Sequence, residues 1–147
     1  MRALQIYLAE DDTDDIDCFR EALREVDKNC TVTVFSNGAE LLDKLCSPAV
    51  FLPDIVLMDI NMPLMNGMEC LKQIRSNAVF KDVPIIMLTT SSSLSTIEIT
   101  YRLGASLFII KPCSYKDQKK MLSSILEIDW NAISRPASSA AFLYDYH

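Results

Sequence analysis

Four short apolar runs, each followed at once by charged or hydroxyl-bearing residues, constrain the fold of this chain more than any other feature. The runs span 4–9, 55–58, 84–88 and 107–110, and the residues that follow them are Glu10-Asp11, Asp59, Thr89 and Lys111-Pro112. Short runs rich in Val, Ile and Leu are typical of strands buried on both faces of a parallel sheet. Because the carboxyl ends of parallel strands open onto one edge, we expect the four polar positions to meet there.

The rest of the chain continues an alternation of strand and helix. Strands are predicted at 4–9, 31–35, 54–58, 84–88 and 107–110, and helical spacing of apolar residues follows each of them. Asn37 and Asn66 can begin the second and third helices, the fourth starts within 91–95 and ends at Gly104, and the fifth spans 115–128. Lys72 and Arg75 are expected to face water. The pattern favours an α/β fold in which a doubly wound parallel sheet carries helices on both faces.

Length and composition bound the class of protein. With 147 residues, the chain is expected to hold one domain over 1–128 and a tail over 129–147, without a separate output domain. The net charge is −6 and no basic run exists, so nucleic-acid binding is not expected. Neither a membrane-spanning stretch nor a secretory signal is visible, so we expect a cytoplasmic protein without membrane contact.

The numbers and positions of the histidine and cysteine residues exclude several kinds of functional site. The one histidine is His147, which excludes most zinc sites, a Ser-His-Asp triad and an internal phosphohistidine donor. The five cysteines are scattered without paired spacing, so reduced thiols are expected.

The acids at the predicted sheet edge favour a divalent cation. Glu10 and Asp11 are adjacent, and bringing Asp59 beside them concentrates negative charge that a cation would offset. Ligands that are all oxygen favour Mg²⁺. The alternative is a solvated acidic run at the start of a helix, and this is the preferred interpretation for the further acids within 12–15.

Asp59, Thr89 and Lys111 add the groups needed for phosphoryl chemistry. A carboxylate at position 59 can bind a cation and can also attack phosphorus, which gives a mixed anhydride. The Thr89 hydroxyl can donate to a phosphoryl oxygen, and the Lys111 ammonium can neutralise Asp59 and then hold a phosphate oxygen. Taken singly, Asp59 also fits a structural cap, Thr89 fits a cap or turn residue, and Lys111 fits an ordinary surface charge. Lys111-Pro112 is a candidate cis peptide that would aim the lysine inward.

Together these residues resemble the receiver domain of two-component response regulators, of the single-domain kind found in chemotaxis regulators and phytochrome response regulators. The resemblance covers about residues 4–128 and rests on the acid pair at 10–11, the string Met58 to Pro63 closing at Gly67, the run 84–89, Gly104-Ala105 and Lys111-Pro112. It implies a flavodoxin-like, five-stranded parallel sheet with strand order 2-1-3-4-5.

The resemblance also implies a role for each position. Asp59 would accept a phosphoryl group from a histidine kinase or a histidine phosphotransfer protein. Mg²⁺ would be bound by Asp11, Asp59 and the backbone carbonyl of Asn61, with Glu10 acting largely through a metal-bound water. Thr89 would move toward the new phosphate, and Phe108 would turn inward as a switch, with a permanently buried Phe108 as the alternative. The protein would be a signalling receiver that catalyses only its own phosphorylation and dephosphorylation.

Output is expected through protein contact. The face of the fourth helix, fifth strand and fifth helix would change its contacts on phosphorylation, either with a partner protein or with a second copy in a homodimer. The tail contains several apolar side chains, namely Trp130, Phe142, Leu143, Tyr144 and Tyr146. Both a frayed terminus and a segment that docks on its own domain, a second subunit or a partner fit this composition.

Three other functions fit parts of the pattern. An aspartyl-nucleophile phosphatase would use the same cation, nucleophile, hydroxyl and lysine, but it needs a second acid where this chain has Asn61. A pseudo-receiver that never takes phosphate would not require the complete set of site residues. A flavodoxin-like FMN carrier needs a phosphate loop rich in Ser, Thr and Gly after the first strand, and the chain has none there.

Overall fold

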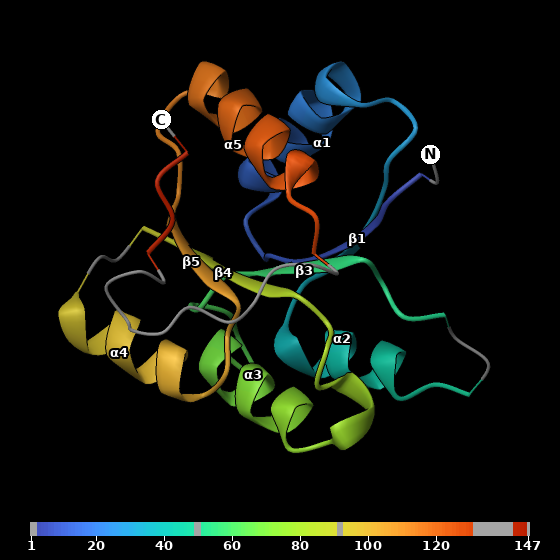
Figure 1. The fold of residues 1–147 in the computed structure, drawn as a ribbon, viewed down its shortest axis with the longest axis vertical. Helices are drawn as coiled ribbons and strands as arrows, with labels where there is room; N and C mark the ends of the chain where they lie inside the picture. The colour runs from blue at the N-terminus through green and yellow to red at the C-terminus, as the bar shows by residue number, and fades with distance from the viewer. Residues whose placement is uncertain (1–2, 49–50, 91–92, 131–142, 147) are drawn as a thin grey trace.

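A five-stranded parallel sheet forms the middle layer of the molecule (Figure 1). The computed structural model describes residues 3–48, 51–90, 93–130 and 143–146. The strands are β1 (Gln5–Ala9), β2 (Thr31–Phe35), β3 (Ile55–Met58), β4 (Ile85–Thr89) and β5 (Leu107–Ile110), in the order β2-β1-β3-β4-β5. This order confirms the expected 2-1-3-4-5 topology, and every neighbouring pair is parallel.

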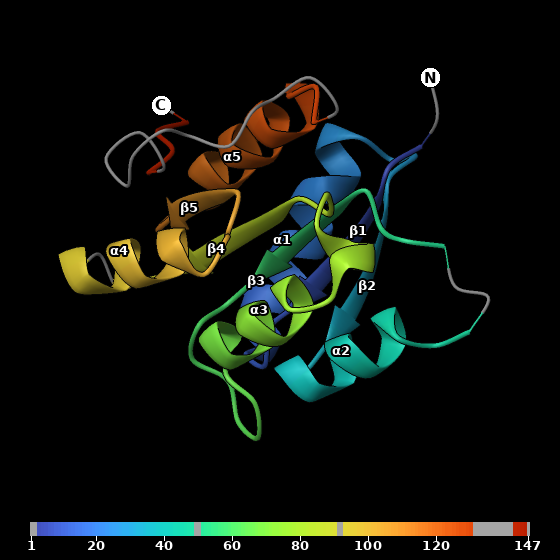
Figure 2. The same cartoon turned by 60° about the horizontal axis from the view of Figure 1, so that its bottom comes forward.

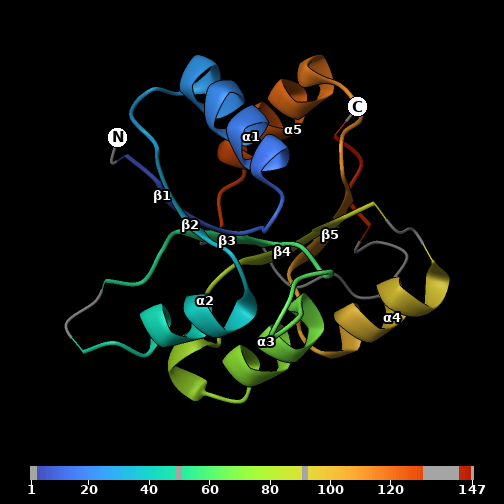
Figure 3. The same ribbon diagram turned by 180° about the vertical axis from the view of Figure 1, so that it is seen from behind.

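Helices cover both faces of this sheet. Within the described ranges, α1 (Thr13–Val26) and α5 (Tyr115–Glu127) lie on one face, as Figures 1 and 3 show from opposite sides. The other face carries α2 (Gly38–Leu45), α3 (Gly67–Arg75) and α4 (Leu94–Arg102), which lie in a row in Figure 2. A short 3-10 helix, η1 (Ala78–Phe80), precedes β4. None of the helices in the described part of the chain combines the length and the apolar character needed to span a membrane.

The alternation of side chains along the strands divides the hydrophobic core in two. In β1, Ile6 and Leu8 belong to the core shared with α1 and α5, whereas Tyr7 and Ala9 belong to the core under α2, α3 and α4. Every residue of β3 and β4 is buried, because helices cover both of their faces. This is why the two central strands show continuous apolar runs in the sequence.

Polar caps set the helix starts near the predicted positions. Asn37 Oδ1 accepts from the N–H of Glu40 at 2.9 Å at the start of α2, and Asn66 begins α3 with a complete capping box. Ser93 caps α4 and lies within the range 91–95 that was predicted for the start of this helix. Residues 91 and 92 of that range lie outside the described residues. Gly104 follows α4 with a φ of 100°, the left-handed conformation expected of a glycine that ends a helix.

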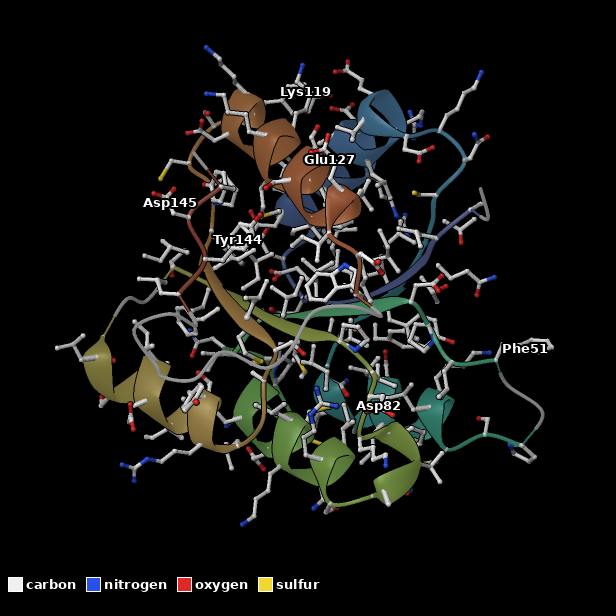
Figure 4. All side chains as sticks on the ribbon, viewed as in Figure 1. Phe51, Asp82, Lys119, Glu127, Tyr144 and Asp145 are labelled. Carbon is white, nitrogen blue, oxygen red and sulfur yellow. The ribbon has the colours of Figure 1, made fainter. Side chains whose placement is uncertain are left out.

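The last described residues lie along β5, the strand at one edge of the sheet. Leu143 forms a parallel bridge with Phe108, and the N–H of Tyr144 donates to the Phe108 carbonyl at 2.9 Å. The Tyr144 hydroxyl lies 2.6 Å from Ser124 Oγ of α5, and Figure 4 shows Tyr144 between β5 and α5. Of the two expectations for the tail, residues 143–146 fit a segment docked on its own domain. Phe142 and the rest of 131–142 lie outside the described residues.

The expectation that Arg75 faces water is wrong. Its Nε donates to the Gly104 carbonyl at 2.8 Å, and its terminal nitrogens donate to the carbonyls of Phe80 at 2.7 Å and Val83 at 2.8 Å. The guanidinium therefore ties the loops that lead into β4 and β5 to the end of α3. Spacing along α3 cannot reveal these partners, because neighbouring loops bring the carbonyls to the end of the helix.

Candidate functional site

The carboxyl edge of the sheet gathers three of the predicted site residues. Glu10 follows β1, Asp59 follows β3 and Lys111 follows β5. The backbone N–H of each donates to a carbonyl at the end of an adjacent strand, over 2.9 to 3.0 Å. The parallel ladder thus continues one residue beyond the strands, and it holds the three side chains in fixed register.

The Lys111 ammonium lies at the centre of the site. Its Nζ is 3.0 Å from Glu10 Oε2, 3.0 Å from Asp15 Oδ2 and 3.1 Å from Asp59 Oδ2. An ammonium has three N–H donors, and each carboxylate takes one of them. Burial alone would lower the pKa of Lys111, but the hydrogen bonds to Asp15 and Glu10 and the charge of Asp59 raise it above its ordinary value. Lys111 is therefore positively charged at neutral pH.

Glu10 is the most deeply buried acid of the site. Its side chain is 4% exposed, and Oε1 accepts from the N–H of Asp12 at 3.2 Å. The pKa of Glu10 is raised to about 7, mainly because the carboxyl is buried; the hydrogen bond from Lys111 opposes this rise, and the charge of Asp59 adds to it. Near neutral pH this carboxyl is therefore divided between its charged and neutral forms.

Three carboxylates lie close enough to share a cation. One oxygen each from Glu10, Asp11 and Asp59 lies within 4.8 Å of the others. The backbone N–H of Asn61 donates to Asp59 Oδ1 at 3.4 Å. A hollow opens over this cluster, lined by Glu10, Asp11, Asp12, Thr13, Asp14, Asp15, Asp59, Asn61, Thr90 and Lys111. A donor set made of oxygen atoms fits a hard divalent ion.

Gly67 shapes the loop that follows Asp59. Its N–H donates to the Ile60 carbonyl at 2.9 Å. A Cβ at this position would collide with the Asp59 carbonyl and would lie 2.9 Å from Ile60 Cα. No side chain fits at position 67 unless the backbone of Asp59 moves.

Known proteins share this sequence pattern and this fold. The sequence profile of the response regulator receiver domain matches residues 6–123. The chain belongs to this family. Receiver domains work in two-component systems, with histidine kinases and output partners.

Individual relatives show how far the similarity extends. The probable methanogenesis regulatory protein FilR2 of Methanothrix harundinacea is 34% identical over 88 residues, which cover 58% of this chain and 57% of that protein. The receiver therefore spans little more than half the length of this relative. The phosphorylated cyanobacterial phytochrome response regulator RcpA is 27% identical with a TM-score of 0.79, over 92% of this chain and 99% of that one. The Mn²⁺-bound form of response regulator Rcp1 is 25% identical with a TM-score of 0.76, over 91% and 99%.

Thr89 and Phe108, the expected switch residues of the receiver, are both fully buried. Thr90 lines the hollow, whereas Thr89 is not among its lining residues in the described part of the chain. The movement of Thr89 toward a phosphoryl group on Asp59 stays a prediction. Phe108 already faces inward, within the core under α2, α3 and α4, which is the position that the alternative interpretation assigns to it.

The predicted cis bond between Lys111 and Pro112 is wrong. The described residues contain no cis peptide bond. The trans form of a bond before proline is favoured by about 0.5–1 kcal/mol. In this form Lys111 already reaches its three carboxylates, so the reason for expecting the cis isomer does not apply.

Asp15 is the site residue that the sequence analysis misses. Its position in the first turn of α1 suggested a solvated acid, but its carboxylate contacts Lys111. The available signal is its spacing from Phe19 and Ala22, which are both buried. Residues four and seven positions apart share a helix face, so Asp15 continues the face of α1 that turns toward the sheet.

Proposed function

We propose that Asp59 reversibly accepts a phosphoryl group and that its phosphorylation controls a protein contact. The observation that supports this most is the meeting of Asp59 and Lys111, whose Oδ2 and Nζ atoms are 3.1 Å apart, with further carboxylates at the same edge. The phosphoryl donor would be the phosphohistidine of a histidine kinase or of a phosphotransfer protein. Membership of the receiver family supports this choice of donor.

The transfer itself follows from the groups at the site. A carboxylate oxygen of Asp59 attacks phosphorus, and a bond forms between them. The bond from phosphorus to the donor breaks, and the donor keeps the electron pair. Lys111 offsets the negative charge on the phosphoryl oxygens, and it is already in place because Glu10 and the backbone hold it at the sheet edge.

We also propose Mg²⁺ as the cofactor. Asp11, Asp59 and the carbonyl of Asn61 would hold it, with Glu10 beside them, and the close carboxylate oxygens fit such an ion. When bound, the ion supplies positive charge next to the phosphoryl oxygens. The solved form of Rcp1 binds Mn²⁺, an ion that prefers the same oxygen ligands, which supports a divalent ion here.

Intact mass measurement after incubation with Mg²⁺ and acetyl phosphate tests the proposal. We expect wild type to gain one phosphoryl group, peptide mapping to place it on Asp59, and Asp59→Asn to stay unmodified. Asp82→Asn is the matched control, because Asp82 (labelled in Figure 4) is exposed and precedes β4, whereas the site lies at the carboxyl ends of the strands. Wild type that stays unmodified, or an Asp59→Asn variant that is modified as readily, would contradict the proposal.

We further propose that the protein is a receiver and not a phosphatase for outside substrates. An aspartyl-nucleophile phosphatase needs a general acid two residues beyond its nucleophile, and the Asn61 amide cannot supply a proton there. We expect no turnover of p-nitrophenyl phosphate. Steady turnover that depends on Asp59 would favour the enzyme instead.

The proposed output lies on the face formed by α4, β5 and α5. This face exposes apolar side chains, since Ile99 is 46% exposed and Ile110 is 38% exposed. Light scattering and pull-down with and without beryllofluoride, a mimic of the acyl phosphate, would reveal a partner protein or a homodimer. Identical behaviour in both states would count against this output. A cytoplasmic location and the lack of nucleic-acid or membrane contact stay predictions.

A further inference from the structure

Asp15 differs from the other two partners of Lys111 in its exposure to solvent. Its side chain is 52% exposed, whereas that of Glu10 is 4% exposed and that of Asp59 is 9% exposed. All three donors of the ammonium are engaged. Phosphorylation turns the Asp59 carboxylate into an acyl phosphate, so one phosphoryl oxygen can take the donor that Asp59 Oδ2 holds now. A second phosphoryl oxygen can reach Lys111 only if Glu10 or Asp15 gives up its place.

Of these two acceptors, Asp15 costs less to release. Its carboxylate would return to water, whereas a released Glu10 would be a buried acid without its cation. The backbone of Asp15 is held separately, because its N–H donates to Asp12 Oδ1 at 3.0 Å as part of the cap of α1. The side chain can thus leave Lys111 while the helix stays intact.

We propose that Asp15 is a positioning residue that competes with the phosphoryl oxygens for the Lys111 ammonium. The inference rests on the proposed function of Asp59. Before phosphorylation, Asp15 neutralises part of the Lys111 charge. Afterwards its negative charge is displaced but stays close to the phosphoryl group, which it repels. Asp15 therefore weakens the hold of this receiver on the phosphoryl group without touching phosphorus itself.

Three variants separate this role from a general effect of charge. Asp15→Asn and Asp14→Asn each remove one negative charge from the same helical turn, but Asp15 is the one of the pair that the structure places against Lys111. Asp15→Glu keeps the charge. In a ¹⁹F NMR titration with beryllofluoride and Mg²⁺, we expect Asp15→Asn to bind about two- to fivefold more tightly than wild type, the range of one exposed ion pair. Asp14→Asn and Asp15→Glu should stay near wild type.

A second readout uses the covalent reaction. The initial rate of modification by low acetyl phosphate should rise in Asp15→Asn by a similar factor, and thermal unfolding should show that all variants are folded. Equal beryllofluoride affinity of wild type and Asp15→Asn would overturn the inference, and so would an equal gain in Asp14→Asn. Wild type that takes neither beryllofluoride nor a phosphoryl group would instead overturn the proposed function of Asp59, so the two failures are distinguishable.

Discussion

Arg75 and Lys111 are cations near opposite ends of β5, and their partners differ in kind. Arg75 donates to backbone carbonyls, three of them within 2.8 Å. Lys111 donates to three carboxylates. The backbone carbonyls are fixed by the fold and stay beside Arg75. A carboxylate can leave the ammonium and bind water or a metal ion, and the ammonium can then bind a phosphoryl oxygen. The cation held by carbonyls therefore secures the fold, and the cation held by carboxylates is available for chemistry.

Arg75→Met should show the largest effect and should act on stability alone. Three short hydrogen bonds from a charged donor would be lost, so we expect the free energy of unfolding to fall by about 4 kcal/mol. Urea denaturation measures this. Arg102→Met is the control, because Arg102 is exposed and pairs with Glu98 one turn away on α4, a pair worth about 0.5 kcal/mol. An equal loss in the free energy of unfolding for Arg75→Met and Arg102→Met would contradict the structural role of Arg75.

The carboxylates around Lys111 predict an unusual dependence of stability on pH. The pKa of Glu10 is about 7 in the folded protein and 4.5 as its ordinary value, so the folded state binds more protons between these values. The contribution of Glu10 is therefore complete below about pH 4.5 and is lost as the pH rises to about 7. The change approaches about 3 kcal/mol at 1.36 kcal/mol per pKa unit.

Glu10→Gln isolates this contribution from the other acids. Urea denaturation of both proteins across this pH range, in EDTA, gives the difference in the free energy of unfolding. We expect wild type to lose stability relative to Glu10→Gln as the pH rises. A difference that stays constant with pH would show that Glu10 binds protons equally in the folded and unfolded states, as it would if Lys111 offset the effect of burial.

Lys111→Met should act on chemistry more than on the fold. Without the ammonium, charge on the phosphoryl oxygens loses a positive partner, so we expect the rate of modification by acetyl phosphate to fall about a hundredfold. Lys119→Met is the matched control, because Lys119 lies on α5, pairs with Glu25 and is part of the outer surface (Figure 4). A Lys111→Met variant that reacts at the wild-type rate would refute the assigned role.

Arg75→Lys should give the smallest effect of the set. The charge stays, but an ammonium lacks the planar fork that meets several carbonyls at once, so we expect a loss of about 2 kcal/mol. Urea denaturation beside Arg75→Met gives the ratio of the two losses. If the lysine restored full stability, charge alone would explain Arg75, and the contrast with Lys111 would weaken.

The sequence predicts well those features that depend on local patterns. The buried central strands and the meeting of Glu10, Asp59 and Lys111 follow from apolar runs and from the shared edge of parallel strands. Contacts made by side chains that lie away from the strand ends are not predicted. Asp15 is on α1 and not directly after a strand, and the carbonyls that hold Arg75 come from loops whose path no side-chain pattern encodes. The trans isomer of the bond between Lys111 and Pro112 could not be predicted from the local sequence either, because the position of Lys111 depends on partners from the whole site.

The close approach of Gly67 to the Asp59 carbonyl has a consequence for genetics. Chance mutations that silence signalling should be recovered at codon 67 as well as at codon 59. Such an allele would encode a protein with every acid and lysine intact, so a survey limited to charged residues would score it as harmless.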